Sequence, residues 1–463
     1  MSITAAPDSF SPQDGAETAP NVLAAAIAET ETPLTPVGTP DAEELLSREE
    51  IEQLQLTRLK ATVRHAYDNV EAYRELYDAH GVTPDDLQTL EDLAKFPFTD
   101  KEFLRKAYPF KSFAVPMEQV RRIHASSGTT GLPTVVGYTD GDIDRWATLF
   151  SRCLRFSGVR PGDIVHNAYG YGLFTGGLGA HYGVEKLGAT VIPMSGGQTE
   201  KQIQLITDFR PRAILCTPTY LLALADGFRK AGLDPRESSL EIAVLGAEPW
   251  TEEMRHEIEK AFNLKACDIY GLSEVMGPGV AGESFDKQDG STIWEDHFRP
   301  EIIDPMTEEV LPTGQHGELV FTTLTKEALP IIRYRTHDLT RLLPGTDRPG
   351  HRRMGRISGR SDDMIILRGV NLFPTQIEEI ALTIEGLSPH FQLELTRPDH
   401  MDQMTVHIER RTECTPEQAK TAGAELARQI KIKVGSSCGV VVAEPDTLAR
   451  SSGKLRRIYD RRQ

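Results

Sequence analysis

Between about Asp163 and Gly271, short apolar runs alternate with segments of helical periodicity. The apolar runs are Ile164–Ala168, Ala189–Pro193, Ala213–Thr217, Ile242–Leu245 and Ala266–Tyr270. The helical segments between them include Thr199–Phe209, Tyr220–Lys230 and Thr251–Phe262. This alternation is typical of βαβ units and predicts an α/β fold built on mostly parallel sheets. Ligands of such sheets bind beyond the carboxyl ends of the strands, where the loops converge.

The pattern of apolar positions also predicts where the ordered part of the chain begins and where a second domain starts. Apolar residues three and four positions apart indicate an amphipathic helix after Ser47; they are Leu56, Leu59, Val63, Tyr67 and Val70. After Gly359 the pattern changes to strand signals, at Met404–Ile408 and Val440–Val442, around a helical stretch, Pro416–Ile432. We expect this last region to be a small α+β domain.

Three parts of the chain follow from these patterns. Residues 1–40 are rich in Ala, Thr, Pro, Asp and Glu without apolar periodicity, so we expect a disordered tail that contributes nothing to a site. Residues 41–358 form the large N-terminal domain, and residues 359–463 form a mobile C-terminal domain. The hinge between them is expected near Arg360–Asp363, with Asp362 as its central residue.

Composition narrows the functional class. The 463 residues are 39% hydrophobic and 26% charged, which is ordinary for a globular protein. A net charge of −17 argues against nucleic acid or an anionic membrane as a partner, because both require positive surface. The five scattered cysteines and the lack of a basic and apolar leader favour the cytoplasm. We found no apolar stretch of about 18 residues that would span a membrane.

The strongest local motif is the loop from Ser126 to Pro133. Its sequence, Ser-Ser-Gly-Thr-Thr-Gly-Leu-Pro, combines glycines with hydroxyl donors, and both suit the close approach of a triphosphate. It is not the common P-loop, because no Gly-Lys-Ser/Thr follows. A polar surface turn is the alternative interpretation.

Four further fragments follow in order along the chain. They are Gly246-Ala247-Glu248-Pro249, Tyr270-Gly271-Leu272-Ser273-Glu274, Tyr334–Asp338 with Gly359–Asp363, and Ser451-Ser452-Gly453-Lys454. With the first loop they resemble the adenylate-forming superfamily of acyl- and aryl-CoA synthetases, from about Ser47 to the end. Within it, other segments are most similar to the phenylacetate–CoA ligases; these are Thr134–Tyr138, Tyr169–Gly177, Gly246–Trp250, Trp294–Asp304 and Arg368–Pro374.

The resemblance implies a nucleotide site. Binding of the phosphates falls to the loop residues Ser126, Ser127, Gly128, Thr129, Thr130 and Gly131. Contacts with adenine fall to Gly246, Ala247, Glu248, Pro249, Asp268, Ile269, Tyr270 and Gly271. Asp338 is similar to the ribose-binding aspartate, with Arg360 adding donors to the sugar or phosphate.

Two residues carry catalytic roles by the same resemblance. Glu274 is similar to the family's magnesium-binding glutamate, since a hard cation prefers carboxylate oxygen and completes its shell with phosphate and water. Lys454 is similar to the C-terminal lysine, whose ammonium stabilises negative charge at the α-phosphate.

The acid site is expected among aromatic residues beside the nucleotide motifs, namely Tyr138, Tyr169, Tyr171 and Phe174. Neighbouring glycines leave room for a flat ring, which favours a small aromatic acid over a long-chain acid. Related proteins carry a cysteine and a histidine where this chain has Ser284 and Thr292, so no zinc is expected. His297 and His337 are expected to be buried or hydrogen-bonding residues without a catalytic role.

The implied activity is an AMP-forming ligation of an aryl acid, with phenylacetate leading, to coenzyme A. ATP and Mg²⁺ serve the first half-reaction, and a homodimer is expected by resemblance. Two alternatives stay open. In the first, the enzyme transfers the activated acid to a carrier-protein thiol, or AMP to a cofactor. In the second, the chain binds nucleotide but is catalytically inactive.

Overall fold

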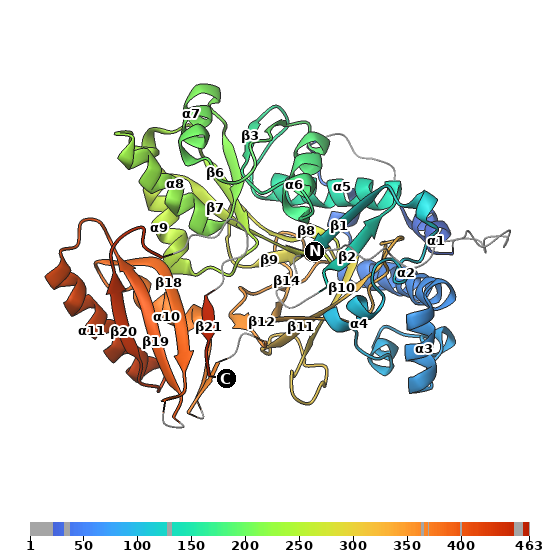
Figure 1. The fold of residues 1–463 in the computed structure, drawn as a ribbon. Coiled ribbons are helices and arrows are strands. Elements are labelled where there is room, and N and C mark those ends of the chain that lie inside the picture. The colour runs from blue at the N-terminus through green and yellow to red at the C-terminus, as the bar shows by residue number, and fades with distance from the viewer. Residues whose placement is uncertain are drawn as a thin grey trace, which may run out of the picture.

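The computed structural model describes residues 22–31, 38–126, 132–362, 365–368, 370–398, 401–448 and 457–462. Figure 1 shows a large part, coloured blue to yellow, beside a smaller orange and red part formed by the last hundred residues. The smaller part has its own apolar core, so the predicted two-domain α/β organisation is confirmed. It packs next to helices α8 and α9 of the larger part (Figure 1).

The α-helices bury apolar residues on one face, and several of them begin at a capping side chain, such as Ser47, Thr139 or Thr217. They are α1 Val22–Thr30, α2 Arg48–Asn69, α3 Glu71–His80, α4 Lys101–Lys106, α5 Asp140–Phe156, α6 Thr175–Lys186, α7 Thr199–Phe209, α8 Pro218–Lys230, α9 Glu252–Phe262, α10 Pro374–Leu382 and α11 Pro416–Lys433. Short 3₁₀ turns lie at η1 Ala42–Leu45, η2 Pro84–Asp86, η3 Glu91–Lys95, η4 Met117–Gln119 and η5 Pro235–Glu237.

The main sheet has the strand order β13-β14-β9-β8-β7-β6-β5-β3-β4. Its strands are β3 Ile164–Asn167, β4 Thr190–Ile192, β5 Ala213–Cys216, β6 Ile242–Gly246, β7 Lys265–Leu272, β8 Gly277–Glu283, β9 Ser291–Ile293, β13 Leu342–Leu343 and β14 Arg353–Met354. Strands β3 to β7 are parallel, whereas β8, β9, β13 and β14 extend the sheet in antiparallel order. The predicted parallel order therefore holds for the βαβ region alone.

Alternate residues of the parallel strands face two separate apolar cores. On β5 and β6, Ala213, Leu215, Ile242 and Val244 face the core that contains α5 and α6. Their neighbours along each strand face the core under α7, α8 and α9. Because successive side chains of a strand point to opposite faces, both faces of this sheet are covered by helices. The loops at the carboxyl ends stay free to build a site.

Two smaller antiparallel sheets complete the larger part. Strands β1 Arg122–Ser126 and β2 Thr134–Tyr138 form a hairpin around the candidate phosphate loop. A second sheet has the order β10-β11-β12-β15, with β10 Phe298–Ile303, β11 Gly317–Thr323, β12 Tyr334–Thr340 and β15 Gly359–Arg360. Its last pairing sets Asp338 opposite Arg360.

The C-terminal part is a four-stranded sheet covered by α10 and α11. The order is β20-β19-β18-β21, with β18 Leu387–Thr396, β19 Gln403–Arg410, β20 Gly439–Ala443 and β21 Ile458–Asp460. A two-stranded ribbon, β16 Ile365–Leu367 and β17 Val370–Leu372, precedes it. The predicted strands and helix of this region are present, which agrees with the expected α+β domain.

Helix α1 corrects the expectation that residues 1–40 are uniformly disordered. Leu23 and Ile27 are 0% and 2% exposed and pack against Ala61 of α2. Arg58 of α2 donates hydrogen bonds to the side chain and carbonyl of Thr30. Two buried apolar residues four positions apart are enough to dock a short helix, although they are too few to make a periodic pattern.

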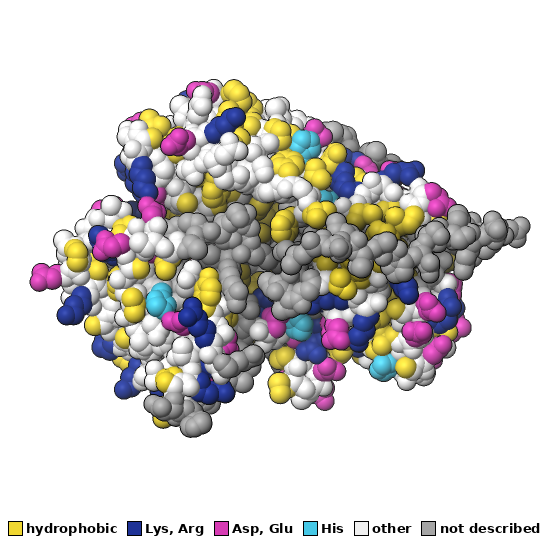
Figure 2. All heavy atoms as spheres, viewed as in Figure 1, with side chains coloured by type: hydrophobic (Ala, Val, Ile, Leu, Met, Phe, Trp, Pro, Cys, Tyr) yellow, Lys and Arg dark blue, Asp and Glu magenta, His cyan; other side chains and the backbone are white. Residues whose placement is uncertain are grey.

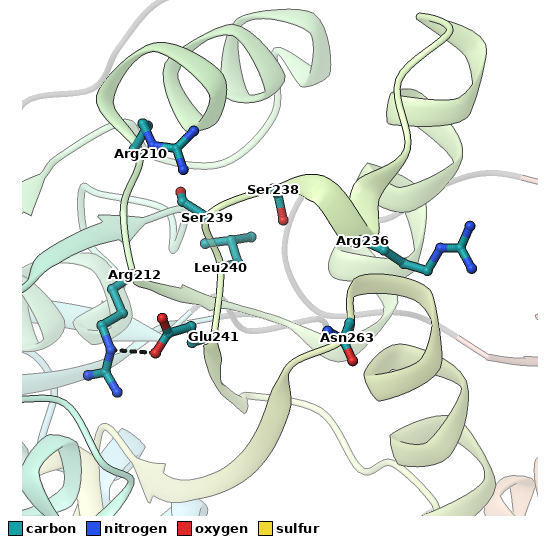
Figure 3. Close-up of a pocket in the computed structure, with 8 residues that line it drawn as sticks. All are labelled: Arg210, Arg212, Arg236, Ser238, Ser239, Leu240, Glu241 and Asn263. Atoms are coloured by element: carbon teal, nitrogen blue, oxygen red, sulfur yellow. Dashed lines mark hydrogen bonds and ion pairs between the residues drawn. The ribbon is translucent and has the colours of Figure 1, made fainter.

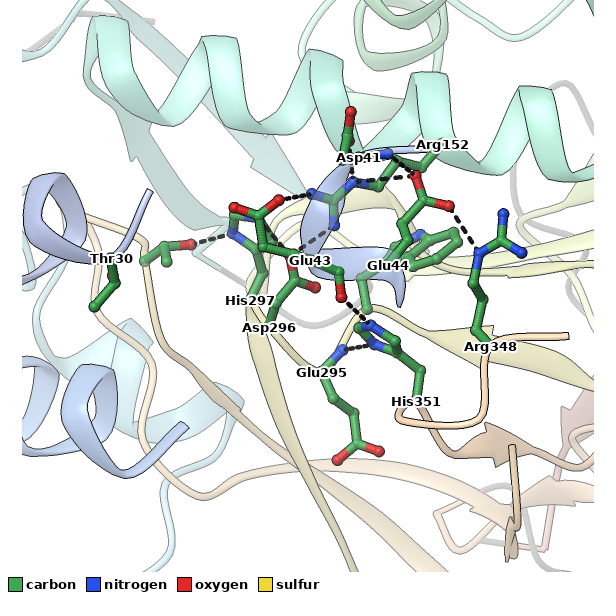
Figure 4. A network of polar contacts seen from close by, with 12 residues as sticks. Thr30, Asp41, Glu43, Glu44, Arg152, Glu295, Asp296, His297, Arg348 and His351 are labelled. Atoms are coloured by element: carbon green, nitrogen blue, oxygen red, sulfur yellow. Dashed lines mark hydrogen bonds and ion pairs between the residues drawn. The ribbon is translucent and has the colours of Figure 1, made fainter. Parts of the chain in front are cut away.

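A buried ionic network holds the next segment, Asp41–Leu45, against the sheet (Figure 4). Arg152 of α5 lies between Asp41, at 2.5 Å, and Asp296, at 2.7 Å. Glu44 pairs with Arg155 and with Arg348. Figure 4 shows these side chains converging from segments far apart in the sequence.

On the face shown in Figure 2, side chains of both charge signs are interspersed over both parts of the molecule. No helix in the described part of the chain is long and apolar enough to cross a membrane.

Candidate functional site

Two of the predicted nucleotide segments meet at the carboxyl ends of neighbouring parallel strands. Gly246, the last residue of β6, pairs with Ile269 of β7. A Cβ atom at Gly246 would lie 2.2 Å from the carbonyl oxygen of Ile269, so only glycine allows this approach. Ala247 follows with a φ of 70°, a left-handed conformation that turns the chain sharply out of the strand.

Acidic groups lie on both sides of this junction. Glu248 accepts a hydrogen bond from the backbone N–H of Thr219 at 2.7 Å, and burial raises its pKa. Burial and the nearby carboxylate of Glu283 raise the pKa of Asp268 to about 6. At neutral pH this carboxyl group is still mostly ionised, so its oxygens can accept hydrogen bonds from a neutral base.

The predicted ribose residues form one chain of contacts. The Tyr270 hydroxyl donates to one oxygen of Asp338 at 2.6 Å, and Arg360 donates to the other oxygen at 2.9 Å. Arg360 also binds Asp362 at 2.8 and 2.9 Å. The structure thus joins residues predicted to contact adenine and ribose, and the predicted hinge residue, in a row.

His337 lies beside this row in a left-handed conformation, with a φ of 64°. Its Nδ1 lies 3.1 Å from the Ser361 hydroxyl and 3.6 Å from Glu318. The interaction with Glu318 raises the pKa of His337. His297 is buried and its Nδ1 lies 2.7 Å from the Thr325 hydroxyl. Both histidines therefore make the structural contacts that were expected.

Ser126 ends β1, and its hydroxyl is buried without a hydrogen-bond partner in the described part of the chain. The remaining phosphate-loop residues, Ser127, Gly128, Thr129, Thr130 and Gly131, lie outside the described residues, as does Lys454. Because β1 and β2 pair from Arg122 to Tyr138, the two ends of the loop lie together. Ser126 is available as a donor at one of them.

Glu274 lies in the loop between β7 and β8 and is 7% exposed. Among the described residues, no side chain or backbone group is bonded to its carboxylate. A buried carboxylate needs a partner, and its oxygen is the ligand type that Mg²⁺ prefers, so Glu274 fits a magnesium ion held with ATP.

Lys326 is a residue near the site that the sequence analysis missed. It is 0% exposed, and its ammonium donates to the carbonyl of Glu274 at 2.9 Å. Burial lowers its pKa to about 8, against the opposing charges of Asp142 and Glu274. A lysine between the apolar runs Gly317–Thr323 and Ala328–Ile332 was the available signal.

The four aromatic residues of the expected acid site lie in different environments. Tyr138 is 0% exposed, stacks on Trp146, and donates to the carbonyl of Met276 at 2.8 Å. It therefore supports the site from the core and does not line a pocket in this structure. Tyr169 is 7% exposed, with a hydroxyl that has no described partner.

Tyr171 accepts a hydrogen bond from Asn167 at 2.8 Å, and Phe174 is 42% exposed. Both follow β3 and lie at the same edge of the sheet as the nucleotide segments. Burial raises the pKa of the Tyr169 hydroxyl. The nearby charges of Asp268 and Glu248 raise it further.

A cavity of about 430 Å³ lies elsewhere, at the amino ends of β5 and β6 (Figure 3). Arg210, Arg212 and Arg236 line it, but Arg212 is paired with Glu241 and Asp163, and Arg236 with Asp234. Arg210 ends helix α7, and the cavity is separate from the candidate site.

Ser284 and Thr292, where no zinc was expected, are both buried. Within the described ranges, no three histidine, cysteine, aspartate or glutamate side chains cluster as metal ligands would. The absence of zinc stays a prediction from the missing thiol and imidazole.

Comparison with known protein families gives two matches. Residues 23–324 match the family described as AMP-binding enzyme, and residues 369–462 match its C-terminal domain. The chain is 59% identical to a phenylacetate-coenzyme A ligase of Aromatoleum evansii over 92% of its own length and 99% of that protein. It is 57% identical to the Escherichia coli phenylacetate-coenzyme A ligase, over 94% and 98% of the two chains.

Solved structures of 2-hydroxyisobutyryl-CoA ligase are also similar. The postadenylation state with its 2-HIB-AMP ligand has a TM-score of 0.87 at 27% identity, covering 94% of each chain. The thioesterification state of that ligase, with CoA, has a TM-score of 0.70 over 94% and 95% of the chains. Because the two states are one protein, the lower score reflects a different arrangement of its parts. The present chain has the arrangement of the first.

Proposed function

The chain belongs to the AMP-binding enzyme family, and from that membership we propose that it joins phenylacetate to coenzyme A, with conversion of ATP to AMP and pyrophosphate. The observation that carries the proposal is the 50–59% identity, over at least 91% of the chain, to four phenylacetate-coenzyme A ligases. No covalent enzyme intermediate is required, because the acyl-adenylate carries the activated acid between two half-reactions.

The contacts at the strand ends support an assignment of the nucleotide site. We assign the ribose to Asp338, whose two oxygens are already held by Tyr270 and Arg360 at hydrogen-bond distance. Adenine is assigned to the space between Gly246–Pro249 and Asp268–Gly271, supported by the close pairing of Gly246 with Ile269. The phosphates are assigned to Ser126–Gly131, supported by the buried Ser126 hydroxyl, which has no hydrogen-bond partner among the described residues.

In the first half-reaction, the acid carboxylate attacks the α-phosphorus of ATP and pyrophosphate leaves. The chain contributes position and charge. Lys454 is assigned to the developing negative charge at the α-phosphate. In the second, the CoA thiol attacks the acyl carbon of the adenylate, loses its proton, and AMP leaves with the bonding electrons.

Magnesium is part of this proposal. Glu274 would hold the ion, supported by its burial and by a carboxylate that lacks a partner in the described part of the chain. When bound, the ion neutralises phosphate charge as pyrophosphate departs.

The acid site is assigned to Tyr169, Tyr171 and Phe174, and Tyr138 supports the site from the apolar core. A CoA-dependent AMP-release screen across arylacetic, benzoic and fatty acids tests the substrate. Phenylacetate or a ring-substituted relative should have the highest kcat/KM. Benzoate, one methylene shorter, should retain weak turnover because such a loss costs about 1–3 kcal/mol. Octanoate outperforming phenylacetate in competition would exclude the aromatic assignment.

The two half-reactions can be separated with two variants. Lys454→Ala should abolish phenylacetate-dependent exchange of pyrophosphate into ATP, at a cost of about 3–4 kcal/mol, yet still make thioester from presynthesised phenylacetyl-adenylate. Asp362→Pro should do the reverse, since proline fixes φ where the hinge must turn. Equal loss of both half-reactions in both folded variants would contradict the two-arrangement mechanism.

We also propose a cytoplasmic location and a homodimer. All five cysteines are free thiols, which supports a reducing compartment. The homodimer rests on family resemblance, and light scattering of the purified protein tests it.

A further inference from the structure

Lys326 is a charged residue in an environment that disfavours charge. Its side chain is 0% exposed, and its ammonium lies 4.9 Å from the centre of the Tyr138 ring. Within the described residues, it makes no ion pair; its hydrogen bond goes to the carbonyl of Glu274. Burial of an ammonium group without a carboxylate partner is costly, so a core with no other requirement would favour an apolar residue here.

The backbone around Lys326 is fixed from both sides. Asp142, near the start of α5, accepts hydrogen bonds from the N–H groups of Glu327 at 2.7 Å and Ala328 at 2.9 Å. On the other side, the Thr325 hydroxyl lies 2.7 Å from Nδ1 of His297. Because the segment is held at both ends, the direction of the Lys326 side chain is set by the fold.

The loop that carries Glu274 is held at three successive points by three different elements. The Thr175 hydroxyl of α6 lies 2.9 Å from the Ser273 hydroxyl. The Tyr138 hydroxyl of β2 donates to the Met276 carbonyl at 2.8 Å. Lys326 donates to the carbonyl between them, that of Glu274 itself. It is the charged donor of the three, and such hydrogen bonds are about twice as strong as neutral ones.

We propose that Lys326 is a positioning residue that holds Glu274 in the orientation required to bind the magnesium–ATP complex. This inference rests on the proposed function. The ammonium fixes the backbone of Glu274 by binding its carbonyl, and its buried positive charge also attracts the Glu274 carboxylate, which has no bonded partner among the described residues. Lys326 acts through Glu274 and touches no substrate.

The test measures ATP binding by calorimetry, once with Mg²⁺ and once with EDTA. Lys326→Met keeps the length and the apolar stem but removes the donor and the charge. We expect the gain in ATP affinity that Mg²⁺ produces to fall about tenfold or more, with affinity in EDTA unchanged within about twofold. Should Lys326→Met fail to fold, Lys326→Gln, which is shorter and neutral, should show the same loss.

Thr175→Val is the matched control, because it removes the contact with the Ser273 hydroxyl of the same loop without touching Glu274. Its magnesium-dependent gain should stay within about threefold of the unsubstituted protein. Combining Lys326→Met with Glu274→Gln should add nothing to the loss caused by Glu274→Gln alone, since both act on one contact.

A folded Lys326→Met protein with an unchanged magnesium-dependent gain would overturn the inference, as would a loss additive with that of Glu274→Gln. Failure of the proposed function is distinguishable from this. In that case the unsubstituted protein itself would lack phenylacetate-dependent pyrophosphate exchange.

Discussion

At the scale of single residues, Asp338 connects the residues proposed for nucleotide binding with the proposed hinge. One of its oxygens receives the Tyr270 hydroxyl and the other receives Arg360, which in turn binds Asp362. Removing the charge of Asp338 should therefore weaken ATP binding. Removing the charge of Asp362 should affect mainly the rotation at the proposed hinge.

We expect Asp338→Asn to weaken ATP binding by about 1.5–3 kcal/mol, the range for hydrogen bonds to a charged group. Asp362→Asn is the matched control, because it also contacts Arg360 but not the assigned ribose position, and its ATP affinity should be unchanged. Titration calorimetry measures both. Equal weakening in the two variants would show that Asp338 acts only through Arg360.

His337 gives a prediction about pH. Its interaction with Glu318 raises its pKa above the ordinary value of about 6.5. The folded protein therefore holds this proton more tightly than the unfolded chain. The resulting stabilisation is present in full below about pH 6.5 and is lost as the pH rises through the folded pKa. His337→Asn, which tolerates the left-handed backbone, removes it.

Urea unfolding at pH 6 and pH 9 measures this effect. The difference in unfolding free energy between the unsubstituted protein and His337→Asn should be larger at pH 6 than at pH 9. A difference that does not change with pH would show that the imidazole contributes only neutral contacts. Over this range Glu318 stays charged, because its interactions with His337 and Arg335 outweigh the effect of burial and hold its pKa at about 2.

At the scale of elements, α1 is the one whose removal is most informative. Deleting residues 1–37 exposes the surface that Leu23 and Ile27 cover and removes the Thr30 acceptor of Arg58. The burial of two such side chains is worth at most about 3–6 kcal/mol. We expect the melting temperature to fall by several degrees, while deletion of residues 1–21 leaves it unchanged. Identical melting of the two truncated proteins would show that α1 contributes no stability.

The sequence predicted most closely those elements whose burial is regular. Helix α7 has the predicted bounds, Thr199–Phe209, because an apolar stripe defines it, and α11, which also begins at the capping residue Thr415, differs by one residue. The antiparallel strands β8 and β9 were missed, since Gly277–Glu283 contains three glycines and little apolar alternation. Their strand conformation comes from pairing with β7 and with each other.

Within the site, residues in motifs were predictable and supporting residues were not. Asp338 and Arg360 could be assigned because each lies in a recognisable fragment. Lys326 could not, because its role depends on a contact with the carbonyl of a residue 52 positions away. Tyr138 was assigned to a pocket on its aromatic character, but only packing against Trp146 shows that it belongs to the core.

At the scale of the whole molecule, ion pairs join the two parts in the arrangement seen here. Arg411 of the C-terminal part binds Glu257 of α9 at 2.6 Å, and Lys230 of α8 binds Asp446 at 2.7 Å. The second pair is largely exposed and should contribute little. The first is better shielded, with side chains 38% and 24% exposed, and should favour this arrangement over the alternative.

Glu257→Arg should therefore slow pyrophosphate exchange about three- to fivefold, by repulsion from Arg411. Thioester formation from presynthesised acyl-adenylate should be unchanged or faster. The double variant Glu257→Arg/Arg411→Glu should restore exchange because it reverses the pair. If the double variant stays as slow as the single one, the pair does not set the balance between arrangements.

The long-range contacts of the N-terminal helices also affect how the protein is made. Arg58 binds the carbonyl of Asp296, Tyr73 that of Pro330, and His351 that of Glu43, across 238 to 308 positions. At about 5–20 residues per second, a ribosome needs roughly 12–50 seconds to supply these partners of α2 and α3. Until then the two helices can pack on nearer residues such as Leu87 and Phe96, and the core that they share with Leu324 and Ile332 is completed late in synthesis. The apolar core of the C-terminal part lies within residues 365–458, so it has no such delay.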